Sequence, residues 1–344
     1  MNPTAQWEPP ESWIKITAID AHTEGEPLRI IRQGYPPLPG DTMLEKRRYA
    51  KENYDHLRKA LMWEPRGHAD MYGCIITPAV TRGADFGVLF MHNAGFSTMC
   101  GHGIIGVTKV ALETGMLEPD AGRTEVKIDT PAGIVTARAI MDGAVVKSVA
   151  FRNIPSFVLS LNQTVNVPGL GHIHCDIAFG GAFYAYVDAE EAGVSLTPED
   201  FRPIIEKGMA IKRAVAKSFP IEHPFEADLS FQYGTIFTGP AQSHSAHSRN
   251  VCVFAEGEVD RSPTGTGVCG RMAIHYARGE VGLDQPLVIE SIIGSRFTGR
   301  VLESLKFGPY DAVIPEVEGT AHITGQSEFY IDPDDELGRG FILR

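Results

Sequence analysis

The stretch Asn93–Gly106 reads Asn-Ala-Gly-Phe-Ser-Thr-Met-Cys-Gly-His-Gly-Ile-Ile-Gly and places Cys100 directly before a glycine-rich turn that opens an apolar helix. The first N–H groups of a helix have no partner within it and carry a partial positive charge. Such a helix start attracts a carboxylate and lowers the pKa of a neighbouring thiol. The sequence therefore predicts that one short segment holds both a reactive thiolate and an anionic ligand.

The same design recurs in the second half of the chain, in the stretch Asp260–Gly270. Aligning Cys100 with Thr264, an offset of 164 residues in a chain of 344, superposes four pairs of glycines: Gly101 on Gly265, Gly103 on Gly267, Gly106 on Gly270 and Gly115 on Gly279. We therefore predict two similar half-sites that face each other, one with a thiol and the other with a hydroxyl.

The composition is that of an ordinary globular protein, with 43% hydrophobic and 22% charged residues and a formal net charge of −12. A chain of this length has room for two domains with hydrophobic cores. The acidic balance and the lack of a basic stripe argue against nucleic-acid partners. The sequence has no signal-peptide pattern and no apolar stretch long enough to span a bilayer, so we expect a cytoplasmic protein that does not bind membranes.

The five cysteines are odd in number and show no paired spacing, which favours reduced thiols over a disulfide framework. Four of them lie among apolar or small neighbours and are expected to be inert core residues. Cys100 differs because it lies in a glycine-rich turn.

Periodicity and capping signals predict strands and helices in each half. In the first half we expect strands at 14–19, 28–32, 70–80, 86–91, 124–129, 134–138 and 145–152, a polar loop at Asp20–Pro27, one capped helix from Thr42 through Leu61, and a buried helix at His102–Thr114. After a linker at Asn162–Leu170, we expect strands within 177–187, 234–238 and 250–254, a helix from Thr197 to about Lys217 and a helix at 268–277. These elements predict an α/β fold of two pseudo-symmetric domains, 13–160 and 161–311, each with a buried central helix and with the active site in the cleft between them.

Both glycine-rich segments match the dinucleotide-binding pattern Gly-x-Gly-x-x-Gly. That fingerprint requires its first glycine directly after a strand. Here nine residues separate Met91 from Gly101, and ten separate Phe254 from Gly265, so a Rossmann fold is disfavoured.

Two further site types find little support. The histidine pairs His172/His174 and His244/His247 lack a second cluster of ligands at a useful spacing, so we predict no metal site. The pattern Gly-x-Ser-x-Gly is missing, so no serine-hydrolase arrangement is predicted.

A thiolate beside an anion-binding helix start suits two kinds of chemistry. Acyl transfer needs a histidine base, and His102 is close in sequence but lies where its backbone N–H is the more useful group. Proton transfer uses the thiolate as a general base on a carbon acid. A carboxylate held by both sets of N–H groups leaves its α-carbon midway between residues 100 and 264, which suits a small amino acid.

Six motifs spread over nearly the whole chain are similar to those of the proline racemase family: His22–Pro27, Glu45–Tyr49, Glu64–His68, Met99–Gly103, Asp260–Gly267 and Ser291–Ser295. The resemblance implies a diaminopimelate-epimerase-like fold whose last segment, 312–344, returns to the first domain. It also implies that the substrate carboxylate is held by backbone groups of four residues: Gly101, His102, Gly265 and Thr266. Asp260 would lie near the ring nitrogen of an imino acid, and no cofactor is needed because preorganised N–H groups meet the developing charge.

In racemases and epimerases of this family two cysteines flank the α-carbon. Cys100 matches the first, but Thr264 stands where the second belongs, and this resembles the branch that dehydrates trans-3-hydroxy-L-proline. A threonine hydroxyl has a pKa far above the ~8.5 of a thiol and relays protons poorly. An elimination needs no proton delivered from the opposite face, so Cys100 can remove the α-hydrogen and, as the resulting thiol, help to protonate the departing hydroxide in a syn elimination.

The expected product of such a dehydration is Δ1-pyrroline-2-carboxylate. Two alternatives stay open: an epimerase of 4-hydroxyproline or racemase of proline, and a non-catalytic imino-acid-binding protein. The expected partner is a small imino acid, and a homodimer is compatible with the sequence.

Overall fold

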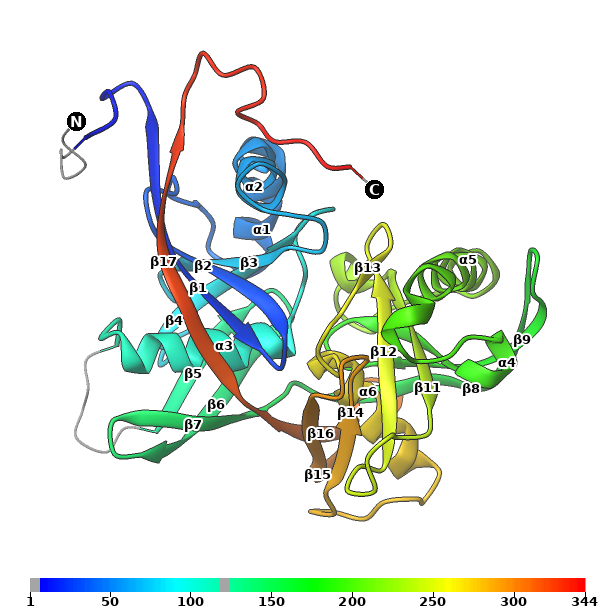
Figure 1. The fold of residues 1–344 in the computed structure, drawn as a ribbon. Coiled ribbons are helices and arrows are strands. Elements are labelled where there is room, and N and C mark those ends of the chain that lie inside the picture. The colour runs from blue at the N-terminus through cyan, green and yellow to red at the C-terminus, as the bar shows by residue number, and fades with distance from the viewer. Residues whose placement is uncertain (1–6, 118–123, 344) are drawn as a thin grey trace.

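The computed structural model describes residues 7–117 and 124–343, and these form two lobes (Figure 1). The strands of the first lobe are β1 (Ile14–Thr23), β2 (Glu26–Gln33), β3 (Tyr72–Thr77), β4 (Phe86–His92), β5 (Glu125–Thr130), β6 (Gly133–Asp142), β7 (Val145–Arg152) and β17 (Ala321–Ile331). Its helices are α1 (Met43–Asn53), α2 (Asp55–Met62) and α3 (Gly101–Glu113).

The second lobe is built in the same way. Its strands are β8 (Ser156–Val167), β9 (Gly171–Phe179), β10 (Phe183–Asp188), β11 (Gln232–Gly239), β12 (Ser248–Phe254), β13 (Glu258–Val259), β14 (Leu287–Glu290), β15 (Arg296–Phe307) and β16 (Tyr310–Gly319). Its helices are α4 (Ala189–Ala192), α5 (Phe201–Ser218) and α6 (Gly265–Ala277), with short 3-10 turns at Pro198–Asp200 and Ala227–Leu229.

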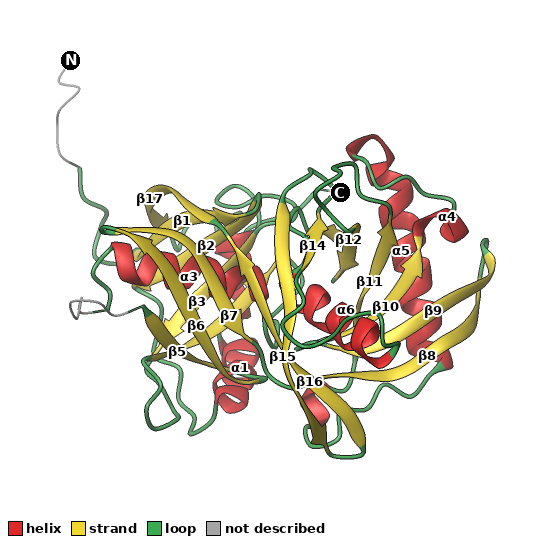
Figure 2. Ribbon diagram, turned by 90° about the horizontal axis from the view of Figure 1, so that it is seen from below, coloured by secondary structure: helices red, strands yellow, loops and turns green. Residues whose placement is uncertain are grey.

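Strand pairing follows the same order in the two lobes. In both lobes the successive pairs are antiparallel, parallel, antiparallel, parallel, antiparallel and antiparallel. In the first lobe these pairs are β1–β2, β2–β3, β3–β4, β4–β5, β5–β6 and β6–β7. In the second lobe they are β9–β10, β10–β11, β11–β12, β12–β14, β14–β15 and β15–β16. In the second lobe β8 pairs with both β9 and β16 and closes the strands into a barrel. The strands thus curl around the helices that carry the two glycine-rich segments (Figure 2).

The C-terminal segment joins the lobes. Strand β16 pairs with β7 of the first lobe as well as with β8 and β15, and after Thr320 the chain continues into β17, which pairs with β1 along its whole length. Figure 1 shows this orange-red segment passing from the second lobe to the first. Long-range pairing of this kind fixes the lobes to each other through backbone hydrogen bonds.

Helices α3 and α6 are buried on nearly every side, as their apolar sequences predict. Helix α3 packs against β1, β6, β7 and β17, and α6 against β8, β9, β15 and β16. Their internal glycines permit this packing: a β-carbon on Gly103 would lie 2.3 Å from the ring of Phe90, and one on Gly106 would lie 2.7 Å from Leu28 Cδ2. No helix in the described ranges is both long enough and apolar enough to cross a membrane.

Three sequence predictions are corrected by the structure. The helix expected from Thr42 through Leu61 keeps its predicted capping box, but it breaks at Tyr54, whose ring packs edge-on against Tyr35 and Tyr49. Local periodicity does not encode such a tertiary contact.

The polar segment Asp20–Pro27 is mostly strand rather than loop, because β17 pairs with β1 as far as Thr23 and leaves only a tight turn before β2. The expected linker Asn162–Leu170 is mostly the outer half of β8, paired with β9 in a hairpin. Residue 160, the predicted end of the first domain, therefore lies inside β8.

Candidate active site

The two glycine-rich helix starts meet at the interface of the lobes. A β-carbon on Gly101 would lie 2.6 Å from Gly265 Cα, which is closer than real β-carbons come to another atom. The positive ends of α3 and α6 therefore converge on one point, and both sets of unpaired N–H groups are available to a single anion.

A single pocket at this point is lined by all seven residues that the sequence singled out: Cys100, Gly101, His102, Asp260, Thr264, Gly265 and Thr266. Their individual roles stay predictions. Six further residues complete the lining: Tyr72, Met99, Tyr184, Tyr233, Cys252 and Phe254. The cavity volume is about 20 Å³, little more than one water molecule needs, so a larger ligand requires the lining to move apart.

Cys100 is the N-cap residue of α3, and its Sγ accepts a hydrogen bond of 3.3 Å from the Gly103 N–H. The thiol is 5% exposed. Burial raises the pKa of Cys100 well above its usual value, and the Gly103 N–H and the Tyr72 hydroxyl oppose this shift. This corrects the expectation of a lowered pKa, because the cost of a charge away from water exceeds the stabilisation from the helix start.

The nearest proton acceptor to the thiol is His102, whose Nδ1 lies 3.1 Å from Cys100 Sγ. Burial lowers the pKa of the His102 imidazole, so the ring is neutral near pH 7 and one of its nitrogens can accept a proton. The backbone carbonyl of His102 accepts a hydrogen bond of 2.8 Å from Thr23 Oγ1, which fixes the first turn of α3 against β1. The predicted role of His102 used its backbone alone, and the side-chain contact with the thiol appears only in the structure.

Thr264 differs from Cys100 in conformation as well as chemistry. Its φ is 65° and its side chain makes no capping bond to α6, whereas Cys100 has extended backbone geometry and caps α3. A β-branched residue rarely adopts positive φ, and such strain persists where the surroundings enforce it. Among the described residues Thr264 Oγ1 has no hydrogen-bond partner, although it is buried at the pocket.

Two carboxyl groups lie beside the pocket. Asp260 accepts a hydrogen bond of 2.8 Å from the Ser262 N–H and is 4% exposed. Glu26 is fully buried and accepts from the Arg261 N–H at 2.7 Å. Burial, with the charge of Asp260 as the second cause, raises the pKa of Glu26 well above its usual value. Of the two, Asp260 is the one that lines the pocket.

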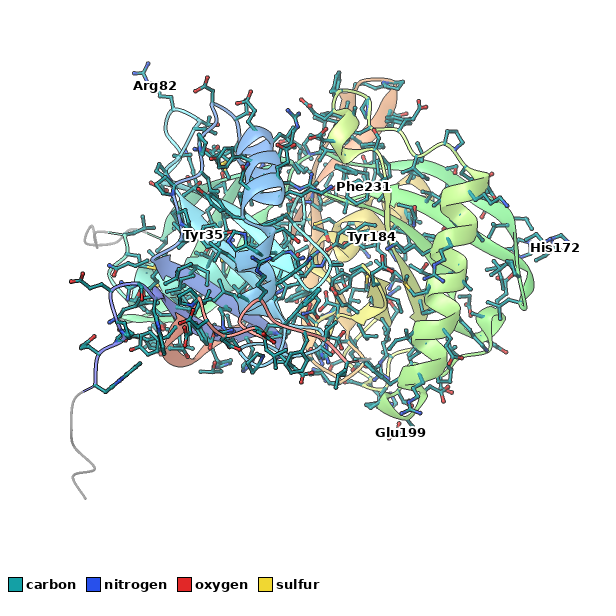
Figure 3. The ribbon with its side chains drawn as sticks, turned by 90° about the horizontal axis from the view of Figure 1, so that it is seen from above. Tyr35, Arg82, His172, Tyr184, Glu199 and Phe231 are labelled. Carbon is teal, nitrogen blue, oxygen red and sulfur yellow. The ribbon has the colours of Figure 1, made fainter. Side chains whose placement is uncertain are left out.

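Aromatic side chains that were not predicted from the sequence form the remaining wall. Tyr233 stacks on Phe254 with ring centroids 5.6 Å apart, and the Tyr184 hydroxyl lies 2.7 Å from Thr266 Oγ1. Figure 3 shows Tyr184 on the side of the second lobe that faces the first. These residues come from β10, β11 and β12, and their only sequence signal is the aromatic, strand-like character of those segments.

The structure describes no group of three or more His, Cys, Asp or Glu side chains that could hold a metal ion. His172 lies at the outer end of the second lobe, far from the interface (Figure 3), and His174 Nδ1 lies 2.6 Å from Glu191 Oε1. The histidines weighed as ligands therefore lie outside the pocket.

Comparison with known proteins identifies the family of the chain. The family model described as Proline racemase matches residues 18–342. The chain belongs to the proline racemase family. A family member from Colwellia psychrerythraea, named trans-3-hydroxy-L-proline dehydratase, is 49% identical over 98% of this chain and 96% of its own length. A human member with the same name is 44% identical over 96% of this chain and 95% of its own.

Among solved proline racemase family structures, a hydroxyproline epimerase from Agrobacterium vitis with bound trans-4-hydroxy-L-proline is 31% identical and superposes with a TM-score of 0.90. The match covers 96% of each chain. This similarity extends the family relationship to the α/β fold of the whole chain.

Proposed function

We propose that this member of the proline racemase family is a cofactor-independent hydro-lyase that converts trans-3-hydroxy-L-proline to Δ1-pyrroline-2-carboxylate. The observation that carries the proposal is the presence of Cys100 and Thr264 in one pocket, at the starts of two facing helices. The dehydratase names of relatives that are 49% and 44% identical support it.

Binding follows from the two helix starts. The backbone N–H groups of Gly101, His102, Gly265 and Thr266 hold the carboxylate, and Asp260 pairs with the ring nitrogen. These donors are fixed before the substrate arrives, so they stabilise the charge that develops when the α-proton leaves.

The chemical step uses one side of the substrate. In trans-3-hydroxy-L-proline the carboxylate and the hydroxyl lie on opposite ring faces, so the α-hydrogen and the hydroxyl share a face. Cys100 removes the α-proton, the electron pair forms the C2=C3 bond and the hydroxyl leaves from the same face. The resulting enamine tautomerises to the imine. The raised pKa of Cys100 makes it a strong base once its proton has passed to His102.

Thr264 closes the opposite face without relaying protons. A hydroxyl is a far weaker acid than a thiol, so the reprotonation that inverts the α-carbon is disfavoured. The match to a hydroxyproline epimerase keeps inversion as the second candidate, and Cys252 is the other thiol that lines the pocket.

The domain organisation that fits this mechanism is a diaminopimelate-epimerase-like pair of halves, predicted from the sequence as 13–160 with 312–344 and as 161–311. Because β8 begins at Ser156 and β16 ends at Gly319, we propose that the halves divide at those two residues. The pairing of β17 with β1 and the matching order of strand pairs support it. A cytoplasmic location and a homodimer stay predictions from the sequence.

The test is incubation of the purified protein with trans-3-hydroxy-L-proline, trans-4-hydroxy-L-proline and L-proline, following imine formation and optical rotation. Imine formation from the 3-hydroxy isomer alone is expected. Faster inversion of the 4-hydroxy isomer than dehydration of the 3-hydroxy isomer contradicts the dehydratase assignment, and binding without turnover contradicts both enzymes.

A further inference from the structure

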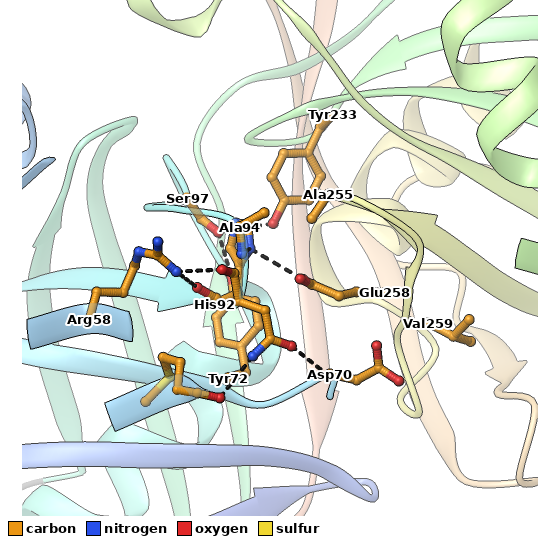
Figure 4. A network of polar contacts seen from close by, with 12 residues as sticks. Arg58, Asp70, Tyr72, His92, Ala94, Ser97, Tyr233, Ala255, Glu258 and Val259 are labelled. Carbon is orange, nitrogen blue, oxygen red and sulfur yellow. Dashed lines mark hydrogen bonds and ion pairs between the residues drawn. The ribbon is translucent and has the colours of Figure 1, made fainter. Parts of the chain in front are cut away.

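A chain of three buried hydroxyl groups runs along the pocket beside Cys100. The Tyr72 hydroxyl is hydrogen-bonded to Ser97 Oγ, and Ser97 Oγ lies 2.9 Å from the Tyr233 hydroxyl. The three residues are 3%, 1% and 9% exposed. Figure 4 shows the Tyr233 hydroxyl, from the second lobe, directed toward Ser97 of the first.

Tyr72 connects this chain to the thiol. Its ring packs edge-on against the His102 ring with centroids 4.7 Å apart, and both residues line the pocket with Cys100. A hydrogen bond from the Tyr72 hydroxyl lowers the pKa of Cys100, against the larger effect of burial. Tyr72 and Cys100 therefore lie next to each other in the lining of the pocket.

This side is where the hydroxyl group leaves under the proposed function, on which the inference rests. Hydroxide is a poor leaving group and needs a proton in the transition state, and a positioned acid contributes about 10²–10⁴-fold to the rate. In the proposed mechanism His102 holds the proton taken from Cys100 and directs its Nδ1 at the sulfur rather than at the leaving group, and Asp260 pairs with the ring nitrogen. With His102 and Asp260 set aside, Tyr72 is the group beside Cys100 whose O–H can donate a proton to the leaving hydroxide.

We propose that the Tyr72 hydroxyl protonates the leaving hydroxide and that Ser97 and Tyr233 position it. The Cys100 thiolate takes the α-proton, the C2–H pair becomes the C2=C3 bond, and the C3–O bond breaks. The departing oxygen takes the Tyr72 proton and leaves as water. The Tyr72 phenolate then takes the proton from the Cys100 thiol, which restores both residues with no outside donor.

Ser97 and Tyr233 are needed to stabilise the Tyr72 phenolate. Burial raises the pKa of Tyr72 well above its usual value, so its phenolate is costly unless hydrogen bonds stabilise it. In the proposed step Ser97 donates to that oxygen and Tyr233 donates in turn to Ser97, a direction that both contacts allow because either hydroxyl of each pair can be the donor. Such a chain strengthens each hydrogen bond in it.

The test compares the elimination of hydroxide with the elimination of fluoride, catalysed by the Tyr72→Phe variant. Fluoride departs without a proton, so trans-3-fluoro-L-proline eliminates HF without needing an acid. We expect kcat for the 3-hydroxy substrate to fall about 10²–10⁴-fold while kcat for the 3-fluoro substrate stays within about threefold of wild type. Ser97→Ala and Tyr233→Phe should show the same selective loss at roughly tenfold.

The matched control is Tyr186→Phe, a buried phenol on β10 that donates to the Gly267 carbonyl and lies outside the pocket lining. It should leave the ratio of the two rates unchanged. L-proline binding, measured calorimetrically, reports whether each variant keeps a folded pocket.

Equal losses of both rates in Tyr72→Phe overturn the proposal, as does a raised KM for the 3-hydroxy substrate with unchanged kcat. If Tyr72→Phe does not fold, Tyr233→Phe becomes the deciding variant. Equal losses of kcat for the 3-hydroxy and 3-fluoro substrates in Tyr233→Phe also overturn the proposal. Failure of wild type to dehydrate the 3-hydroxy substrate would instead remove the proposed function.

Discussion

A β-carbon on Gly265 would lie 2.7 Å from Gly101 Cα and 3.0 Å from the Gly101 carbonyl carbon. The contact between these two glycines is reciprocal, so neither position can carry a side chain without moving a helix start. Because the proposed carboxylate site is made of backbone N–H groups on both sides of this contact, its geometry depends on both positions being glycine.

Gly265→Ala should therefore disturb catalysis even though alanine favours helices. Displacement of the α6 start by a fraction of an ångström to 1 Å is expected to lower kcat/KM about 10²-fold. The control is Gly325→Ala, where an added β-carbon meets no atom within 4 Å. Steady-state kinetics on both purified variants check this, and equal activity of the two would contradict the close approach of the helix starts.

Cys100→Ser should nearly abolish turnover while preserving the fold. The swap is almost isosteric, but a serine hydroxyl is too weak an acid to supply a usable base, so we expect kcat to fall at least about 10³-fold. Cys175→Ser, on β9 and outside the pocket lining, should stay within about twofold of wild type. Activity of Cys100→Ser within about tenfold of wild type, roughly 1.4 kcal/mol of barrier, rules out Cys100 as the base.

Thr264→Cys should give the enzyme a measurable ability to invert the α-carbon. The new thiol lies on the face opposite Cys100 and can deliver the proton that the hydroxyl cannot. The measurement is solvent deuterium exchange at the α-carbon with chiral analysis of 4-hydroxyproline. Thr264→Ser, which keeps the hydroxyl, is the control and should show no inversion. A folded Thr264→Cys that dehydrates but never inverts would argue against two groups facing each other across the α-carbon.

Glu26 and Glu45 should affect stability with opposite dependence on pH. Burial raises the folded-state pKa of Glu26, so the folded protein binds this proton more tightly than the unfolded chain does. Its stabilising contribution is present below the unfolded pKa of ~4.3 and is lost as pH rises through the folded pKa. The melting temperature of wild type minus that of Glu26→Gln should therefore decrease as pH is raised from about 4 toward 8.

Glu45 supplies the contrast. Hydrogen bonds from the Asp41 and Thr42 backbone lower the pKa of this exposed capping residue. Its contribution is present above the unfolded pKa and is lost as pH falls through the folded pKa. The melting temperature of wild type minus that of Glu45→Gln should therefore increase as pH rises from about 2 to 5 and stay level above that. Calorimetric melting curves from about pH 2 to 8 distinguish the two residues, and parallel curves for Glu26→Gln and wild type would mean that the folded-state pKa of Glu26 is not raised.

The amino-acid order alone was enough to predict the two half-sites. Cys100 and Thr264 each precede a glycine-spaced apolar helix, and the unpaired N–H groups that make a helix start a candidate anion site are a local property of the chain. The same local signals predicted the buried helices α3 and α6 and the capping box at Thr42. They also carried the resemblance to the proline racemase family.

Only the tertiary structure decided what surrounds the thiol. The hydroxyl chain draws Tyr72 from β3, Ser97 from the turn before α3 and Tyr233 from β11, and no periodicity links segments so far apart in the chain. The raised pKa of Cys100 likewise reflects burial by both lobes, which outweighs the helix start. Backbone capping depends on neighbours along the chain, whereas the solvation and hydrogen bonding of a buried side chain depend on which distant strands close over it.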